Sequence, residues 1–133
     1  MKRVLLIGLL PSAVDFSSLA SSAFPDLTPE KLLLGIQAQE KSLRDLGFDL
    51  TDCLVDGGET AEAVTLAALQ ARTYDVVVIG AGVRTLPAHF LLFEKLLNLV
   101  HEHAPKARIC FNTRPEDTQA AVLRWVDARG ISG

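Results

Sequence analysis

The sequence predicts an α/β domain in which four parallel β-strands alternate with helices that cover both faces of the sheet. Short aliphatic runs recur along the chain, and segments with helical spacing of apolar residues lie between them. The run Val76-Val77-Val78-Ile79 is continuous and β-branched, which is typical of a strand buried on both sides. Because strands and helices alternate, the strands should pair in parallel through right-handed crossovers.

The composition is that of one globular domain spanning residues 1–133. Hydrophobic residues make up 49% of the chain and charged residues 22%, a balance that permits a substantial core. The formal net charge is −3 and basic residues form no run, so neither nucleic acid nor an anionic membrane is expected as a partner. No apolar stretch reaches the roughly 20 residues that span a bilayer.

The first strand is predicted from Arg3 to Ile7, ending at Gly8. The same region partly fits a secretory signal peptide, because basic residues precede it and small residues follow it. Asp15 and Phe16 interrupt the stretch that would approach a cleavage site, and removing the segment would leave the strand at 76–79 short of a neighbour. We therefore favour the strand.

The remaining elements follow in order. Thr28-Pro29-Glu30 supplies an N-cap, a first-turn proline and a first-turn acid for a helix that ends at Gly47. Residues 48–55 alternate partly in polarity, as in an edge strand, and the alanine-rich segment 61–72 predicts a second helix. The third strand at 76–79 is followed by the loop 80–85.

Two further helices and one strand complete the chain. A helix should begin at Pro87 and run to about His103, the fourth strand is expected at 107–111, and the last helix should span 115–130. The predicted buried face of this last helix consists of Val122, Trp125 and Val126.

The first and third strands have the most continuous apolar runs and should be central, which gives the strand order 2-1-3-4. This three-layer arrangement resembles flavodoxin-like and Rossmann-like sheets. The order reverses between strands one and three, so a crevice is expected above their C-terminal ends. Cys53 and Cys110 then lie on opposite edges, about 14 Å apart and beyond disulfide reach. Two free thiols favour a reducing, cytoplasmic location.

The loop after the third strand is the predicted ligand site. Gly80 and Gly82 would let a ligand approach the backbone, and a helix start behind them would present free N–H groups. Arg84 and Thr85 stand where they would contact a phosphate or carboxylate. The alternative is that the two glycines are needed only for the turn.

The exit of the fourth strand should bring Asn112, Thr113 and Arg114 to the same edge, so that Arg84 and Arg114 converge on one anion. The competing interpretation is that Thr113 caps the last helix and Arg114 is solvated. An arginine at the N-terminal end of a helix opposes the helix dipole, which marks Arg114 as a position worth testing for function.

Asp15 and His89 are the candidates for a catalytic acid or base. Asp15 lies in the long segment 8–26, which would serve as a lid, a binding wall or plain surface coil. His89 falls in the first turn of the predicted third helix, where a histidine is also common as a surface residue.

Motifs of three families with this architecture are missing. The loop after the first strand has no G-x-G-x-x-G fingerprint, so a nicotinamide cofactor is not expected and Asp56 is interpreted as a turn residue. The phosphoacceptor of receiver domains would end strand three, where Gly80 stands, and the cobalamin-binding Asp-x-His-x-x-Gly motif does not occur. No Cys/His/carboxylate grouping has metal-ligand spacing, so no cofactor and no metal are expected.

Apolar residues cover more than one face of the helix predicted at 87–103. The surplus around Leu92 and Leu99 predicts a two-fold homodimer, and the alternative is packing against the first loop or a neighbouring helix.

Together these patterns predict a protein that binds a small anionic or polar metabolite above strands one, three and four. The alternatives are a small hydrolase, lyase or transferase that uses Asp15 or His89 with the two arginines, and a dimeric interaction protein without a ligand. No nucleophile–base set is recognisable, which favours binding over catalysis.

Overall fold

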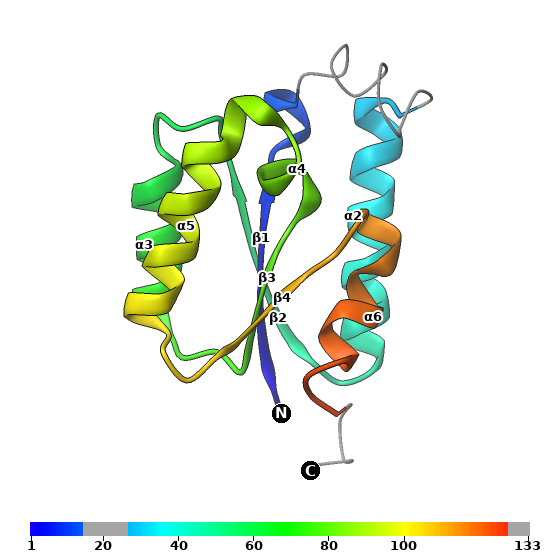
Figure 1. Ribbon diagram of the computed structural model, residues 1–133. Coiled ribbons are helices and arrows are strands. Elements are labelled where there is room, and N and C mark those ends of the chain that lie inside the picture. Colours follow the sequence, from blue (N-terminus) through cyan, green and yellow to red (C-terminus); the bar gives the residue numbers. More distant parts are fainter. Residues whose placement is uncertain (15–26, 128–133) are drawn as a thin grey trace.

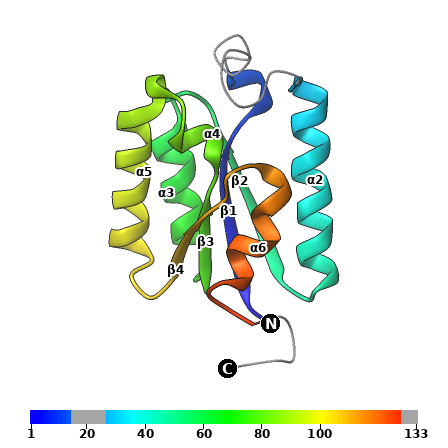
Figure 2. The same ribbon diagram turned by 45° about the vertical axis from the view of Figure 1, so that its right-hand side comes forward.

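The computed structural model describes residues 1–14 and 27–127, in which a central sheet lies between two layers of helices (Figures 1 and 2). The strands are β1 (Arg3–Leu9), β2 (Asp49–Val55), β3 (Val76–Ile79) and β4 (Arg108–Phe111). The α-helices are α2 (Pro29–Asp45), α3 (Ala61–Ala71), α4 (Ala81–Arg84), α5 (Phe90–His103) and α6 (Thr118–Leu123). Short 3₁₀ helices form η1 (Pro11–Ala13), η2 (Pro87–His89) and η3 (Pro115–Asp117).

The four strands are all parallel and lie in the order β2-β1-β3-β4, which confirms the predicted sheet. Ile7 of β1 pairs with Ile79 of β3, and Ile79 pairs in turn with Phe111 of β4. This register brings the C-terminal ends of β3 and β4 to one level, and β1 continues for two more residues beside β2. The loops that leave them therefore gather at one end of the sheet.

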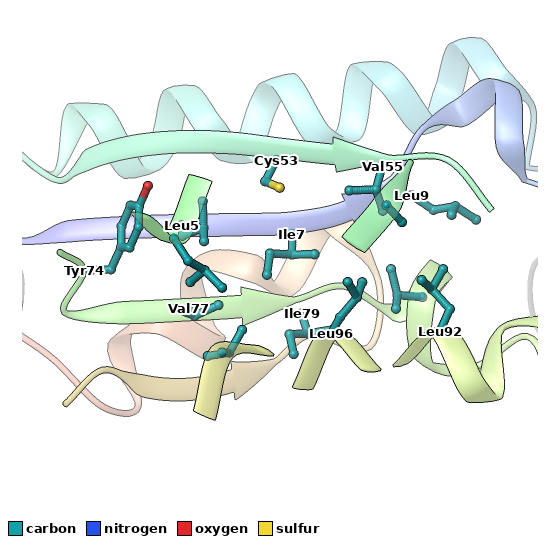
Figure 3. Close-up of a cluster of buried hydrophobic side chains, with 14 of the residues drawn as sticks. Leu5, Ile7, Leu9, Cys53, Val55, Tyr74, Val77, Ile79, Leu92 and Leu96 are labelled. Atoms are coloured by element: carbon teal, nitrogen blue, oxygen red, sulfur yellow. The ribbon is translucent and has the colours of Figure 1, made fainter. Parts of the chain in front are cut away.

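Each face of the sheet carries its own core. On the face covered by α3 and α5, alternate side chains of β1 and β3 pack against Leu92 and Leu96 of α5 (Figure 3). On the opposite face, Val4 and Val76 pack against Leu43 of α2 and Val122 of α6. Figure 1 shows this division, with α3 and α5 on one side of the strands and α2 and α6 on the other. The expected helical layer on each face is confirmed.

Helix α2 begins and ends as its sequence predicts. The Thr28 side chain accepts a hydrogen bond from the backbone N–H of Lys31 at 3.2 Å, which satisfies one of the unpaired donors of the first turn. Gly47 follows the helix with a φ of 98°, a left-handed conformation that favours glycine.

The segment after β3 differs from the single helix predicted from Pro87. Helix α4 forms first, and Leu86 is extended (ψ 124°) before the turn η2 and helix α5 begin. Proline disfavours helical backbone in the residue before it, which accounts for the break at Leu86. Val83 of α4 is buried and joins the core on the α5 face.

The last helix is shorter than predicted, and one of its expected core residues is not buried. Helix α6 ends at Leu123, and the predicted end at Gly130 lies outside the described residues. Trp125 is 51% exposed, so its placement on the buried face was wrong; the guanidinium of Arg108 lies 5.9 Å from the centroid of its indole ring. Arg124 turns back and donates to the carbonyl of Phe111 at 2.8 Å.

The two leucines from which a homodimer was predicted are used within the chain. Leu92 is buried in the core, and Leu99 packs against the same cluster. The reason is that α5 contacts α3 as well as the sheet, so it needs a wider apolar face than a helix on a sheet alone. The exposed apolar side chains of α5 are instead Phe90 and Leu91.

Cys53 of β2 and Cys110 of β4 are buried free thiols on opposite edges of the sheet, as predicted. Burial raises the pKa of both thiols, that of Cys110 to about 11, so both are protonated at neutral pH. Within residues 1–14 and 27–127, none of the helices has the length and apolar character needed to cross a membrane.

Leu43 should be the side chain through which α2 is most strongly held to the sheet, because it is fully buried whereas Leu34 of the same helix is 64% exposed. Leu43→Ala should lower the free energy of unfolding by about 2–5 kcal/mol, since it leaves a cavity in the core. Leu34→Ala should change it by less than about 0.5 kcal/mol. Urea unfolding followed by circular dichroism measures both, and equal effects would contradict this assignment.

Candidate functional site

A cleft of about 120 Å³ opens at the C-terminal ends of β1 and β3, between α2 and the segment that joins β4 to α6. Its aliphatic lining comes from β1, α2 and β2 and includes Leu6, Leu9, Leu32, Ile36 and Leu54. Its polar lining comes mostly from the β4–α6 side and includes Asn112, Thr113, Arg114, Glu116 and Thr118. The cleft lies where the strand order reverses, the usual position of ligand sites in open α/β sheets.

Six of the seven residues proposed from the sequence as ligand contacts line this cleft. They are Gly80, Gly82, Thr85, Asn112, Thr113 and Arg114. The seventh, Arg84, is not among the lining residues. Of the two arginines expected to meet on one anion, Arg114 alone contributes to the cleft wall.

The glycines of the β3–α4 turn have a packing role. A Cβ atom on Gly80 would lie 3.4 Å from the carbonyl oxygen of Ile7, and one on Gly82 would lie 3.3 Å from the Cβ of Leu9. The absence of side chains therefore lets the turn lie directly against β1. The tight contact at Gly82 favours glycine there without a ligand, whereas a Cβ on Gly80 would lie at the limit of ordinary van der Waals contact.

Asn112 is the centre of a buried hydrogen-bond network beside the cleft. It is 5% exposed, its Oδ1 accepts from the N–H of Ala81 at 2.9 Å, and its Nδ2 donates to Thr118 Oγ1 at 2.9 Å. Thr118 in turn donates to the carbonyl of Pro115 at 2.7 Å. The network ties the start of α4 to the start of α6, which fixes two walls of the cleft relative to each other.

The side chain of Arg84 joins the ends of two strands. Its Nε donates to the carbonyl of Ile79 at 3.0 Å, its Nη2 donates to the carbonyl of Asn112, and its guanidinium lies 5.0 Å from the centroid of the Phe111 ring. Partial burial lowers the pKa of Arg84, although the charge of Asp117 opposes this. Arg84 therefore satisfies the carbonyl of Ile79 at the end of β3 and that of Asn112 just after β4, and these hydrogen bonds account for its absence from the cleft lining.

Asp117 organises the loop that carries Thr113 and Arg114. Its carboxylate accepts hydrogen bonds from the backbone N–H of Thr113 at 2.9 Å, from the Thr113 hydroxyl, and from the N–H of Arg114 at 3.4 Å. Partial burial by itself would raise the pKa of Asp117, but these hydrogen bonds outweigh it and lower the pKa. The negative charge also offsets the unfavourable placement of Arg114 before η3 and α6.

Of the two catalytic candidates, His89 alone can be located relative to the cleft. His89 does not line it; a Cβ on Gly57 would lie 3.4 Å from His89 Cε1, so this ring packs against the loop after β2. Asp15 lies outside the described residues. Asp56 is a turn residue, as expected: it accepts from Thr60 Oγ1 at 2.6 Å and Gly58 N at 3.0 Å, and these contacts, led by Thr60, lower its pKa.

Sequence reasoning missed the wall that α2 contributes. Leu32 and Ile36 have the apolar character and helical spacing expected of residues that face the core, yet they line the cleft. Figure 1 shows the reason: the first turns of α2 rise above the ends of the strands, where the sheet no longer covers them. The signal in the sequence was the helix start directly after the long segment 8–26.

No protein-family model matches the chain, and none of the curated proteins compared with it matches either. Among the described residues, no group of three or more His, Cys, Asp or Glu side chains is placed to hold a metal ion.

The two hydrogen bonds through which Arg84 joins the carbonyls of Ile79 and Asn112, here called the Arg84 clamp, should contribute to the free energy of unfolding. Arg84→Ala leaves the carbonyls of Ile79 and Asn112 without this donor, and we expect a loss of about 1–3 kcal/mol in the free energy of unfolding. Arg84→Lys should also lose stability, because an ammonium lacks the fork that bridges two acceptors. Lys106→Ala, at an exposed position, is the matched control in urea unfolding. Stability equal to the unmutated chain in Arg84→Ala would refute the clamp.

Proposed function

We propose that the protein binds a small molecule with an apolar body and a polar or anionic end, in the cleft above β1, β3 and β4. The observation that carries the proposal is the aliphatic lining from β1, α2 and β2, with Arg114 on the opposite side. Ligand sites of small molecules are typically concave and apolar, with a few polar groups that set orientation.

The hydrogen bonds of the polar lining support the apolar character of the ligand. Asn112 and Thr118 bond to each other, Thr113 donates to Asp117, and Thr85 donates to the carbonyl of Ala81. Polar groups that are already paired within the chain add little to the binding of a purely polar metabolite. Most of the affinity would come from buried apolar area, at about 25 cal/mol per Å².

The sequence predicted an anionic or polar ligand, and we propose that the anionic group lies at one end of the ligand. The guanidinium of Arg114 is the positive charge in the described lining, and a guanidinium pairs well with a carboxylate or phosphate. Glu116 also lines this region, so its negative charge would favour a ligand with a single, well-placed anionic group over a highly charged one.

Binding is favoured over catalysis by the chemistry of the lining. Among the described residues that line the cleft there is no histidine, cysteine or aspartate, and Glu116 is the one carboxylic acid. A hydrolase, lyase or transferase would need a nucleophile and a base within hydrogen-bond reach of each other.

A graded set of ligands tests this proposal. We expect thermal stabilisation by straight-chain carboxylates to increase from acetate to octanoate, because each methylene adds buried apolar area. Octanoate should stabilise more than 1-octanol, and Arg114→Ala should abolish that difference. Differential scanning fluorimetry with calorimetric titration measures both effects.

A cleft-filling variant provides the control. Ile36→Trp should block octanoate binding, whereas Leu34→Trp, on the exposed side of the same helix, should leave it unchanged. Stabilisation by inorganic phosphate or acetate as large as that by octanoate, or octanoate binding that survives Ile36→Trp, would contradict the proposal.

A further inference from the structure

Helix α2 carries a buried acid that the packing of the core does not require. Glu40 is 8% exposed, and its Oε2 has no hydrogen-bond donor among the described residues. The group that interacts with this carboxyl is itself a carboxyl, that of Asp52 at an exposed position of β2. Two carboxyl groups in contact hydrogen bond to each other only when one of them holds a proton.

The pair lies directly below the cleft. Glu40 is four residues after Ile36, so both lie on the same face of α2, and Asp52 is two residues before Leu54, so both lie on the same face of β2. Ile36 and Leu54 line the cleft. The contact between Glu40 and Asp52 is therefore the next layer of the α2–β2 interface beneath the two cleft walls.

Few other charged groups face this carboxyl. On α2 itself, Arg44 attracts the ionised form of Glu40, while Lys41 pairs with Asp45 at 2.7 Å in solvent. On β1, the side chains directed at α2 are apolar. Helix α6, over 118–123, carries no titratable side chain.

The 3₁₀ helix η3, which also packs on α2, contributes two acids. Glu116 lies beside Gly35, more than one helical turn from Glu40, and Asp117 is bonded to Thr113. Burial first, and the hydrogen bond and charge of Asp52 next, raise the pKa of Glu40 to about 7, with Arg44 opposing the rise. The acid thus titrates in the neutral range.

We propose that Glu40 and Asp52 share one proton that fastens α2 to β2 below the cleft, and that release of this proton to solvent loosens the α2 wall and weakens ligand binding. When the proton leaves, the pair changes from one negative charge to two, and the hydrogen bond between the carboxyls is lost. This shared-proton hydrogen bond between Glu40 and Asp52, here called the fastening, does not depend on a ligand. Its effect on ligand binding rests on the proposed function.

The direction of the pH effect follows from the raised pKa. Because the pKa of Glu40 is higher in the folded chain than its ordinary value of 4.5, its stabilising contribution is complete below about pH 4.5 and is lost as the pH rises through about 7. We expect the loss of this contribution to lower the folding equilibrium constant roughly 10- to 100-fold between pH 5 and pH 8.

Urea unfolding between about pH 5 and pH 8, the range that the linkage relation selects, tests the fastening. Glu40→Gln keeps the shape and supplies an amide donor to Asp52, so it should remove this part of the pH dependence and stabilise the chain at the upper end. Asp52→Asn should reduce this part of the pH dependence. Glu30→Gln, an exposed acid in the first turn of α2, should keep the full slope. Identical slopes in Glu40→Gln and the unmutated chain would overturn the proposal.

A direct titration covers the case in which a variant does not fold. The carboxyl carbon of Glu40 in the unmutated chain, followed by NMR, should titrate near pH 7. Amide exchange in the first half of α2, corrected for intrinsic rates, should accelerate above that pH. Titration of Glu40 near its ordinary value of 4.5 would overturn the proposal on its own.

The effect on binding has a separate readout. Octanoate should bind more weakly at pH 8 than at pH 6 in the unmutated chain, and with equal affinity at both in Glu40→Gln. Equal pH dependence in the two proteins would overturn the coupling. Failure of octanoate to bind at either pH would overturn the binding proposal and the coupling, and the unfolding slopes would still decide the fastening.

Discussion

The pairing of β1 with both β2 and β3 is the interaction on which the rest of the structure depends. Because β1 is buried on both faces and bonded along both edges, it sets the register of the sheet and the level at which the strands end. The chain leaving β1 leads to α2 on one face, and the chain leaving β3 leads to α4 and α5 on the other. The cleft lies between these two exits, so its position follows from strand order alone.

The strands end at the cleft, so backbone groups at and just beyond their ends have no neighbouring strand to pair with. These groups need hydrogen-bond partners from side chains. Arg84 donates hydrogen bonds to the carbonyls of Ile79 and Asn112, and the Asn112 side chain accepts one from the N–H of Ala81, a donor just after β3. The same residue types would serve equally well to recognise an anion. The hydrogen bonds of Arg84 and Asn112 hold the cleft walls in place, and Arg114 is the basic side chain among the described residues that line the cleft.

Much of this fold could be predicted from the sequence because its signals are local. The β-branched run at 76–79, the cap at Thr28 and the glycine at 47 each act within a few residues, and the strand order followed from ranking apolar runs. The cleft was placed correctly by topology, but periodicity shows only that a side chain such as Ile36 is apolar, not whether a sheet or a cavity lies opposite it. The direction of the Arg84 side chain depends on which acceptors the fold leaves unpaired, which no local pattern records.

The outer edge of β4 has a consequence for how copies of this chain meet. An edge strand offers unpaired backbone groups to any other strand, and short length, charge and obstruction are the usual ways to prevent such pairing. Strand β4 has four residues, and Arg124 occupies the carbonyl of Phe111, while the guanidinium of Arg108 lies over the Trp125 ring beside it. By the general rule for edge strands, these positions of Arg124 and Arg108 should hinder the pairing of another strand with β4.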